Sequence, residues 1–315
     1  MSLKIAIQMD PVETINIYTD STFVLGLEAQ KRGYTLFYYT PSMLALENGK
    51  VTAQVFPLEL RREKGNHFAL GPAETMDLAA DVDVVLMRQD PPFDMAYITA
   101  THILDHLAGQ TLVVNNPTGV RNAPEKLLVT HFPHLAPPTL ITSDALRVKE
   151  FHRQYKDIIL KPLYGNGGAQ VFHIDESGRN LNALLEMFGD YYREPIIAQK
   201  YLPEARNGDK RIILVDGAPV GAILRIPASG ETRANLHVGG TAQKTGLTPR
   251  EVEICKTIGP VLYEQGLLFA GIDVIGDYLT EINVTSPTGL QEINALNDDC
   301  LEAKIWDAIE KRLAA

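Results

Sequence analysis

The stretch 269–293 carries acidic and amide side chains at a spacing that could hold metal ions. Read as a hairpin, it places Asp273, Glu281 and Asn283 on one face, because side chains alternate along a strand. A three-residue loop at 276–278 sets Asp273 opposite Glu281. A two-residue turn would place Asp273 on the face away from Glu281, so we predict the longer loop. Such oxygen ligands suit Mg²⁺, which is usually bound by substrate phosphates as well as by the protein. The solvated face of an ordinary hairpin would show the same pattern.

A glycine-rich segment in the middle of the chain is a second candidate site. The strand-like residues 158–161 precede the loop 162–168, PLYGNGG, and residues 169–174 alternate like another strand. A Walker phosphate loop needs GK[ST] and a following helix, so that motif is excluded. A flap between antiparallel strands remains, and its backbone N–H groups could cover phosphates because glycine permits close approach. A plain glycine-containing turn fits the same letters.

Length and composition exclude several classes of protein. The chain has 315 residues, 45% of them hydrophobic, which is enough for two or three domains. A net charge of −10 without a basic stripe argues against nucleic-acid binding. The histidines lack zinc-site spacing, and Cys255 and Cys300 are too few for a disulfide framework. With no long apolar stretch and no signal-like N-terminus, we expect a cytoplasmic protein.

The periodicity of the remaining residues predicts an α/β chain. The first third alternates strands and helices as in a small doubly wound parallel sheet, with strands at 3–9, 35–39, 82–87 and 111–114 and helices at 20–32 and 96–107. Asp20, Ser21 and Thr22 are the candidates for the N-cap of the first helix. Residues 41–80 are less regular. Later segments comprise a hairpin turn at Asp216-Gly217, a long loop at 226–240, and helices at 248–265 and 299–313. Thr248 and Glu251 have the spacing of a capping box at the start of the first of these helices.

The order of these pieces resembles the ATP-grasp superfamily. Lys126 precedes the glycine-rich loop, Lys161 ends a strand, the segment AQKYL (198–202) follows at the next edge, and the carboxylates come last. Over essentially its whole length the chain is similar to bacterial glutathione synthetases. The similarity is carried by long strings that include LMRQDPPFD, DIILKPLYGNGGA, GDKRIILVDG, LRIPASGETRANLHVGG and FAGIDVIGDYLTEINVTSPTG.

The resemblance implies an ATP-grasp fold of the α/β (α+β) class in three domains. These are an N-terminal doubly wound parallel-sheet domain at 1–122, a central ATP-grasp lid subdomain with the flap at 123–202, and a C-terminal catalytic domain at 203–315. The implied activity is ATP-dependent ligation of γ-L-glutamyl-L-cysteine and glycine through an acyl phosphate. ATP is then the co-substrate and Mg²⁺, or Mn²⁺, the cofactor. The implied partners are small molecules, without nucleic acid or membrane, and a homo-oligomer, as a tetramer, is expected.

The resemblance also assigns roles to individual residues. Arg211 and Arg225 are expected to be catalytic. The nucleotide contacts are expected from Lys126, Lys161, Tyr164, Gly165, Gly167, Gly168, Gln199, Lys200, Tyr201, Leu202 and Asp209. The substrate contacts are expected from Arg88, Arg233, Asn283, Ser286, Pro287 and Thr288, and the metal ligands are Asp273, Glu281 and Asn283. Each arginine could instead be structural. Lys200 and the segment 289–291 depart from the family pattern, and Lys200 leaves the details of the nucleotide contacts open.

Two other functions fit parts of the pattern. One is a different ATP-grasp ligase, such as one that joins D-alanine or extends a peptide. The other is a regulatory nucleotide-binding module without chemistry, against which the full set of metal ligands and arginines argues. In a ligase, closure of the loop 226–240 would keep water from the acyl phosphate.

Overall fold

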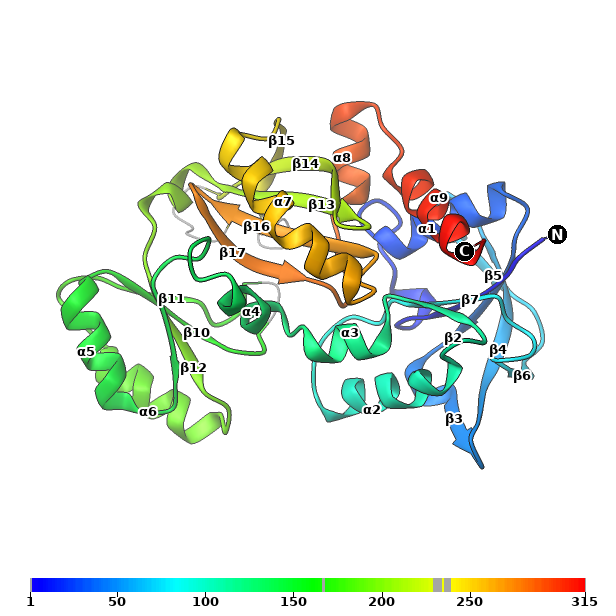
Figure 1. The fold of residues 1–315 in the computed structure, drawn as a ribbon, viewed down its shortest axis with the longest axis horizontal. Helices are drawn as coiled ribbons and strands as arrows, with labels where there is room; N and C mark the ends of the chain where they lie inside the picture. Colours follow the sequence, from blue (N-terminus) through cyan, green and yellow to red (C-terminus); the bar gives the residue numbers. More distant parts are fainter. Residues whose placement is uncertain (1, 166–167, 229–233, 235–238, 315) are drawn as a thin grey trace.

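The structure is a computed structural model that describes residues 2–165, 168–228, 234 and 239–314. These residues form three sheets, one in each of the regions predicted as domains, whose exact limits stay a prediction. Figure 1 shows the central region at the left, the C-terminal region in the middle and the N-terminal region at the right. Among the described residues, no helix combines the length and apolar character needed to cross a membrane.

The N-terminal region is built on an eight-stranded sheet in the order β3-β4-β2-β1-β7-β8, with β5 and β6 paired to β4. The predicted parallel part runs from β2 to the edge strand β8, and in it β1 pairs with β2 and β7, and β7 with β8. The irregular stretch 41–80 forms antiparallel strands at one edge. The strands are β1 (Lys4–Gln8), β2 (Thr35–Tyr39), β3 (Leu44–Glu47), β4 (Lys50–Leu60), β5 (Phe68–Leu70), β6 (Glu74–Asp77), β7 (Val84–Met87) and β8 (Leu112–Val114).

The helices of this region begin at the residues that the sequence marks as caps. The Asp20 side chain accepts a hydrogen bond from the Phe23 backbone N–H, which satisfies one of the free donors at the start of α1. Asp94 does the same for α2. The α-helices are α1 (Ser21–Lys31), α2 (Met95–Leu104) and α3 (Pro117–Asn122), and short 3₁₀ turns cover Val12–Thr14, Pro41–Met43 and Asp105–Leu107.

The central region confirms the antiparallel strands on either side of the glycine-rich loop. Its sheet has the order β11-β10-β12-β9, and β10 pairs antiparallel with both β11 and β12. Figure 1 shows α5 and α6 on the outer side, where they close a separate core. The elements are α4 (Glu125–Leu128), a 3₁₀ turn (Val129–His131), β9 (Thr139–Thr142), α5 (Ala145–Tyr155), β10 (Ile158–Pro162), β11 (Phe172–Ile174), α6 (Leu181–Tyr191) and β12 (Ile196–Lys200).

The C-terminal region is a five-stranded sheet in the order β15-β14-β13-β16-β17. The helix α7 begins with the capping box predicted at Thr248 and Glu251 and packs on the sheet. The predicted turn between β13 and β14 is present, with positive φ values of 49° at Asp216 and 77° at Gly217. The elements are a 3₁₀ turn (Pro203–Asn207), β13 (Asp209–Val215), β14 (Ala218–Ile226), β15 (Thr241–Lys244), α7 (Pro249–Glu264), β16 (Phe269–Ile275), β17 (Tyr278–Asn283), α8 (Leu290–Asn297) and α9 (Leu301–Leu313).

The β16–β17 hairpin differs from the prediction at its turn. Asp273 lies opposite Glu281, which confirms the predicted pairing. The three-residue loop is wrong, because Ile275 pairs with Tyr278 across a two-residue turn. A bulge after Asp273 inserts Thr280, whose hydroxyl donates to the Asp273 carbonyl at 3.0 Å. The extra residue restores the register, so a short turn and the acidic pair occur together.

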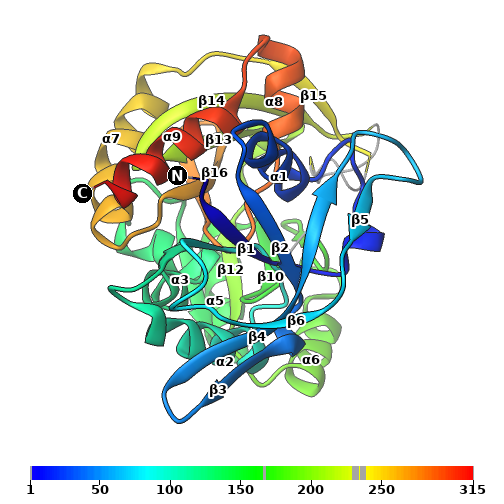
Figure 2. The same cartoon turned by 90° about the vertical axis from the view of Figure 1, so that its right-hand side faces the viewer.

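The last two helices tie the C-terminal region to the N-terminal one. Figures 1 and 2 both show α9 beside α1. The indole N–H of Trp306 donates to the Leu25 carbonyl at 2.8 Å, and Arg32 donates to the Ala303 carbonyl at 3.0 Å. One buried hydrophobic cluster runs through β1, α1, β13, β16 and α9. The central region, by contrast, has its own core.

Candidate active site

A cleft of about 880 Å³, open to solvent, lies between the central sheet and the β16–β17 hairpin. It brings together most of the residues predicted to bind the nucleotide, namely Lys161, Gly168, Gln199, Lys200, Tyr201, Leu202 and Asp209. Lys126 and Gly165 line a small pocket that adjoins this cleft, and Tyr164 and Gly165 line another small pocket. Gly167 lies outside the described residues. The Lys200 side chain is exposed, whereas Gln199, Tyr201 and Leu202 are buried.

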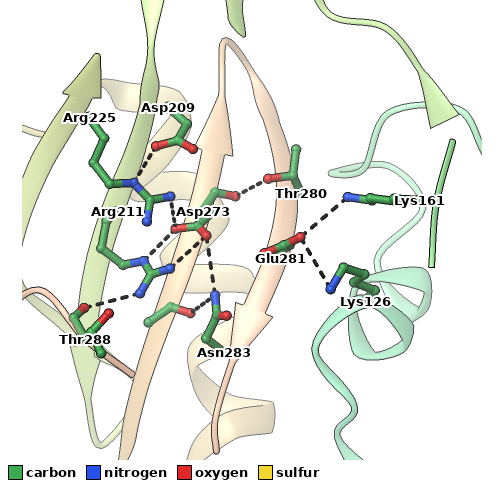
Figure 3. A network of polar contacts seen from close by, with 11 residues as sticks. Lys126, Lys161, Asp209, Arg211, Arg225, Asp273, Thr280, Glu281, Asn283 and Thr288 are labelled. Carbon is green, nitrogen blue, oxygen red and sulfur yellow. Dashed lines mark hydrogen bonds and ion pairs between the residues drawn. The ribbon is translucent and has the colours of Figure 1, made fainter. Parts of the chain in front are cut away.

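Two buried lysines meet one carboxylate beneath the glycine-rich loop. The Nζ atoms of Lys126 and Lys161 lie 3.7 Å and 3.5 Å from Oε1 of Glu281 (Figure 3). Lys126 also donates to the Gly165 carbonyl in the loop itself. Burial opposes ionisation of Glu281, but the two lysines hold its pKa below the ordinary value. The base of the loop is therefore a paired cationic site of the kind that phosphates require.

Asp273 is held between two arginines from neighbouring strands (Figure 3). Arg211 grips it with two bonds, at 2.6 Å from Nε and 2.9 Å from Nη2, and Nη2 of Arg225 lies 2.9 Å from the same carboxylate. Arg225 also donates from Nε to Asp209 at 2.6 Å. Burial would raise the pKa of Asp273, but the arginines hold it well below its usual range. The two predicted catalytic arginines are thus fixed by a shared anion.

Of the three residues predicted to bind a metal ion, Glu281 and Asn283 are better placed than Asp273 to bind a divalent cation. Both bonds of the Asn283 side chain, to the Gly271 carbonyl at 3.2 Å and to Asp273 at 3.5 Å, use Nδ2. That leaves its Oδ1 and the Oε2 of Glu281 as acceptors, and such hard oxygens suit Mg²⁺. Both oxygens of Asp273 are engaged by arginine.

A second cavity, of about 1320 Å³ with open solvent included, lies on the other side of Arg225 and Glu281. It brings together Arg211, Asn283 and the loop Thr285–Gly289, so the predicted Ser286, Pro287 and Thr288 all line it. Arg88 does not line this cavity. It is 5% exposed, and its Nε and Nη2 donate to Thr22 and to the Pro287 carbonyl, each at 3.0 Å. Arg233 lies outside the described residues.

The structure adds residues to which the sequence analysis gave no individual role. Asn16, Thr19 and Asp90 of the N-terminal region line the second cavity, and so does Glu125, the residue before Lys126. Burial, and then the nearby Glu281 carboxylate, raise the pKa of Glu125 to about 7. The position of Asp90 just after a buried parallel strand was a usable signal, because ligands bind at such strand ends. Glu125 gave no comparable signal.

The fold is shared with solved ATP-grasp proteins. D-cycloserine synthetase DcsG superposes with a TM-score of 0.69 at 15% identity, covering 98% of this chain and 99% of that chain. An ATP-grasp RimK domain protein from Sphaerobacter thermophilus superposes with a TM-score of 0.64 at 14% identity, covering 97% and 98%. At these identities the likeness shows the fold alone, and it confirms the predicted architecture.

Sequence comparison narrows the class to one family. Residues 3–121 match the prokaryotic glutathione synthetase N-terminal domain, and residues 125–298 match the ATP-grasp domain of the same family. The glutathione synthetase of Brucella melitensis is 57% identical over 312 residues, covering 99% of this chain and all of that protein. The one from Agrobacterium fabrum is 58% identical over 309 residues, covering 98% and 97%. The chain belongs to the prokaryotic glutathione synthetase family, as the resemblance implied, and is an ATP-dependent ligase.

Proposed function

We propose that the chain joins γ-L-glutamyl-L-cysteine and glycine to form glutathione, with release of ADP and phosphate. The observation that carries this proposal is the meeting of the two cavities, because Arg225 and Glu281 line both of them. A nucleotide in the first cavity would present its γ-phosphate at that shared wall. An acid substrate in the second cavity would present its carboxylate to the same place.

The chemistry that this arrangement supports has two steps. A carboxylate is a poor electrophile, so the cysteinyl carboxylate first attacks the γ-phosphate of ATP and gives an acyl phosphate and ADP. The amine of glycine then attacks the acyl carbon, and phosphate leaves. No covalent protein nucleophile is needed. Arg211 and Arg225 would stabilise the charge that builds up on the acyl phosphate and the tetrahedral intermediate, because fixed donors are most effective where charge develops.

The nucleotide roles follow the walls of the first cavity. Lys126 and Lys161 would act as point charges on the phosphates once these replace Glu281 as their partner. The glycine-rich loop, with Tyr164, Gly165, Gly167 and Gly168, would cover the phosphates, and the backbone of 199–202 would read adenine. Asp209 is the proposed ribose ligand, although one of its oxygens already accepts from Arg225.

The proposed metal ligands all lie on the β16–β17 hairpin. We propose that Glu281 and Asn283, with Asp273 beside them, hold Mg²⁺, for which Mn²⁺ can substitute. When bound, the ion supplies Lewis-acid stabilisation of the phosphate oxygens and a template for their alignment. The protein's own part is to keep these oxygens on one face of the hairpin and Lys126 and Lys161 opposite them.

The residues proposed to contact the two acid substrates lie on the loop 285–289 and among the arginines. Ser286, Pro287 and Thr288 lie on the wall of the second cavity and would contact the substrates. Arg88 and Arg233 were predicted to grip substrate carboxylates, and the contacts of Arg88 favour a different role that is developed below. We further propose a homo-oligomer, as a tetramer, on the family resemblance alone. Multi-angle light scattering of the purified chain tests that state.

The test of the function is a product assay. Incubation of the purified chain with ATP, Mg²⁺, γ-glutamylcysteine and glycine should give glutathione, ADP and phosphate in equal amounts. Replacement of both substrates by D-alanine should give no ligation product, which separates this function from that of a D-alanine ligase. ATP binding without any ligation product would instead identify a regulatory nucleotide-binding module.

A further inference from the structure

We propose that Arg88 is a positioning residue, which fixes the loop 285–289 against the N-terminal region and through that loop sets the place of Arg211. This inference rests on the proposed function, since it assigns Arg88 to the same ligation reaction. It differs from the sequence prediction, in which Arg88 grips a substrate carboxylate directly.

The contacts of Arg88 and Ser286 form a reciprocal clasp between the two regions. The Arg88 guanidinium donates from Nη2 to the Pro287 carbonyl at 3.0 Å, and the Ser286 hydroxyl donates back to the Arg88 carbonyl at 3.2 Å. The guanidinium is oriented from behind by Thr22 in α1, whose hydroxyl accepts from Nε at 3.0 Å. It also lies over the Phe269 ring, 5.1 Å from its centroid. Because the donors have fixed directions, these bonds favour one position of the loop relative to α1.

The clasp is connected to the catalytic arginine by the next residue of the loop. The Thr288 carbonyl accepts from Nη1 of Arg211 at 3.2 Å, while the other two nitrogens of Arg211 hold Asp273. Thr288 follows Pro287 directly, so a shift of the Pro287 carbonyl moves an acceptor of Arg211. The loop therefore joins the N-terminal region to the reacting centre.

The burial of Arg88 argues against a direct grip on substrate. Its side chain is absent from the wall of the second cavity, whereas Asp90, two residues later, is part of that wall. Burial lowers the pKa of Arg88, and the nearby Asp20 and Asp90 carboxylates oppose that shift. A buried arginine whose Nε and Nη2 are already hydrogen-bonded within the protein is suited to fixing backbone.

A pair of substitutions at Thr22 tests the clasp without touching either cavity. Thr22→Val keeps the shape and removes the acceptor of Nε, while Thr22→Ser keeps the hydroxyl. Loss of one bond to a charged group predicts a roughly tenfold fall in kcat for Thr22→Val, with the KM for ATP changed by less than about twofold. Thr22→Ser should retain the wild-type rate. An unchanged kcat in Thr22→Val would overturn the proposal.

A substrate analogue separates the positioning role from a direct grip. 4-Aminobutyryl-cysteine lacks the free carboxylate of the γ-glutamyl group, and methylamine lacks that of glycine. If Arg88 acts through the loop, Arg88→Gln should lose the same factor, about 100-fold or less, with the normal and the truncated substrates. If its effect vanishes with either truncated substrate, Arg88 grips that carboxylate and the inference is wrong. A wild-type chain that makes no glutathione at all would instead refute the proposed function, and the inference with it.

Discussion

Replacement of Asp273 by Asn should destabilise the fold more than the same kind of change at Glu281, the carboxylate opposite it on the β16–β17 hairpin. The carboxylate makes three contacts of 2.6–2.9 Å with two arginines that are each 6% exposed. Removal of one partner from a buried ion pair leaves uncompensated charge and typically costs about 3–5 kcal/mol. Because Asp209 still partners Arg225, we expect the lower part of that range, about 3 kcal/mol.

Glu281→Gln is the matched control, on the facing strand of the same hairpin. Glu281 contacts its lysines at the longer distances of 3.5 Å and 3.7 Å, and its own side chain is 25% exposed. Because the two lysines are buried, its loss should still cost about 2 kcal/mol, which is less than the loss of Asp273. The two variants should rank in the opposite order in their requirement for Mg²⁺. Glu281→Gln should raise the Mg²⁺ concentration needed for half-maximal ligation more than Asp273→Asn does, because Glu281 keeps a free oxygen.

Urea unfolding at neutral pH, followed by circular dichroism, measures the first comparison, and ligation rates at a series of Mg²⁺ concentrations measure the second. An Asp273→Asn variant as stable as Glu281→Gln would refute the view that Asp273 mainly holds the arginines. An Asp273→Asn variant with a normal Mg²⁺ requirement would remove Asp273 from the metal site and leave Glu281 and Asn283 to carry it.

Three further predictions concern other parts of the molecule. The folded chain keeps the Glu125 proton up to a pKa of about 7, against an ordinary value of 4.5, so wild-type stability should fall as the pH rises through that window. Glu125→Gln should lose that slope, and parallel stability curves would contradict the shift. Arg32→Ala removes the bonds to Ala303 and Glu310 and should lower the free energy of unfolding in urea by about 2 kcal/mol. Lys31→Ala, on the exposed side of α1, is the control and should lower it by under about 0.5 kcal/mol. Equal losses would show that the bonds to α9 add nothing. Replacement of residues 226–240 by a short glycine-serine linker should increase the phosphate released per glutathione formed, and unchanged coupling would exclude a shielding role.

The sequence predicted the elements that local chemistry determines. Asp20 as a helix cap, the capping box at Thr248 and the turn at Asp216-Gly217 are each specified by a few adjacent residues, and each is present. The pairing of Asp273 with Glu281 also followed from sequence, because only one register keeps both carboxylates on one face. Its turn did not, since a bulge can correct a register and leaves no clear signature in a single sequence.

The remaining features depend on segments far apart in the chain. The clasp joins Arg88 to Pro287, and Trp306 donates to Leu25, so neither contact can be seen from spacing. The elevated pKa of Glu125 likewise arises from Glu281, on another sheet. The contacts of Asp273 with Arg211 and Arg225 could not be predicted either, because nothing in the sequence states which cation a carboxylate will face, and its binding of a metal stays a prediction.

The central claim is that the acidic hairpin and the glycine-rich loop face one another across a single nucleotide. Crystals of the chain grown with ADP and Mn²⁺ test it most directly, through the anomalous signal of the metal. We expect a metal peak in contact with Glu281 and Asn283, beside phosphates that are held by Lys126 and Lys161. A metal peak away from this hairpin, or phosphates bound away from both lysines, would contradict the account.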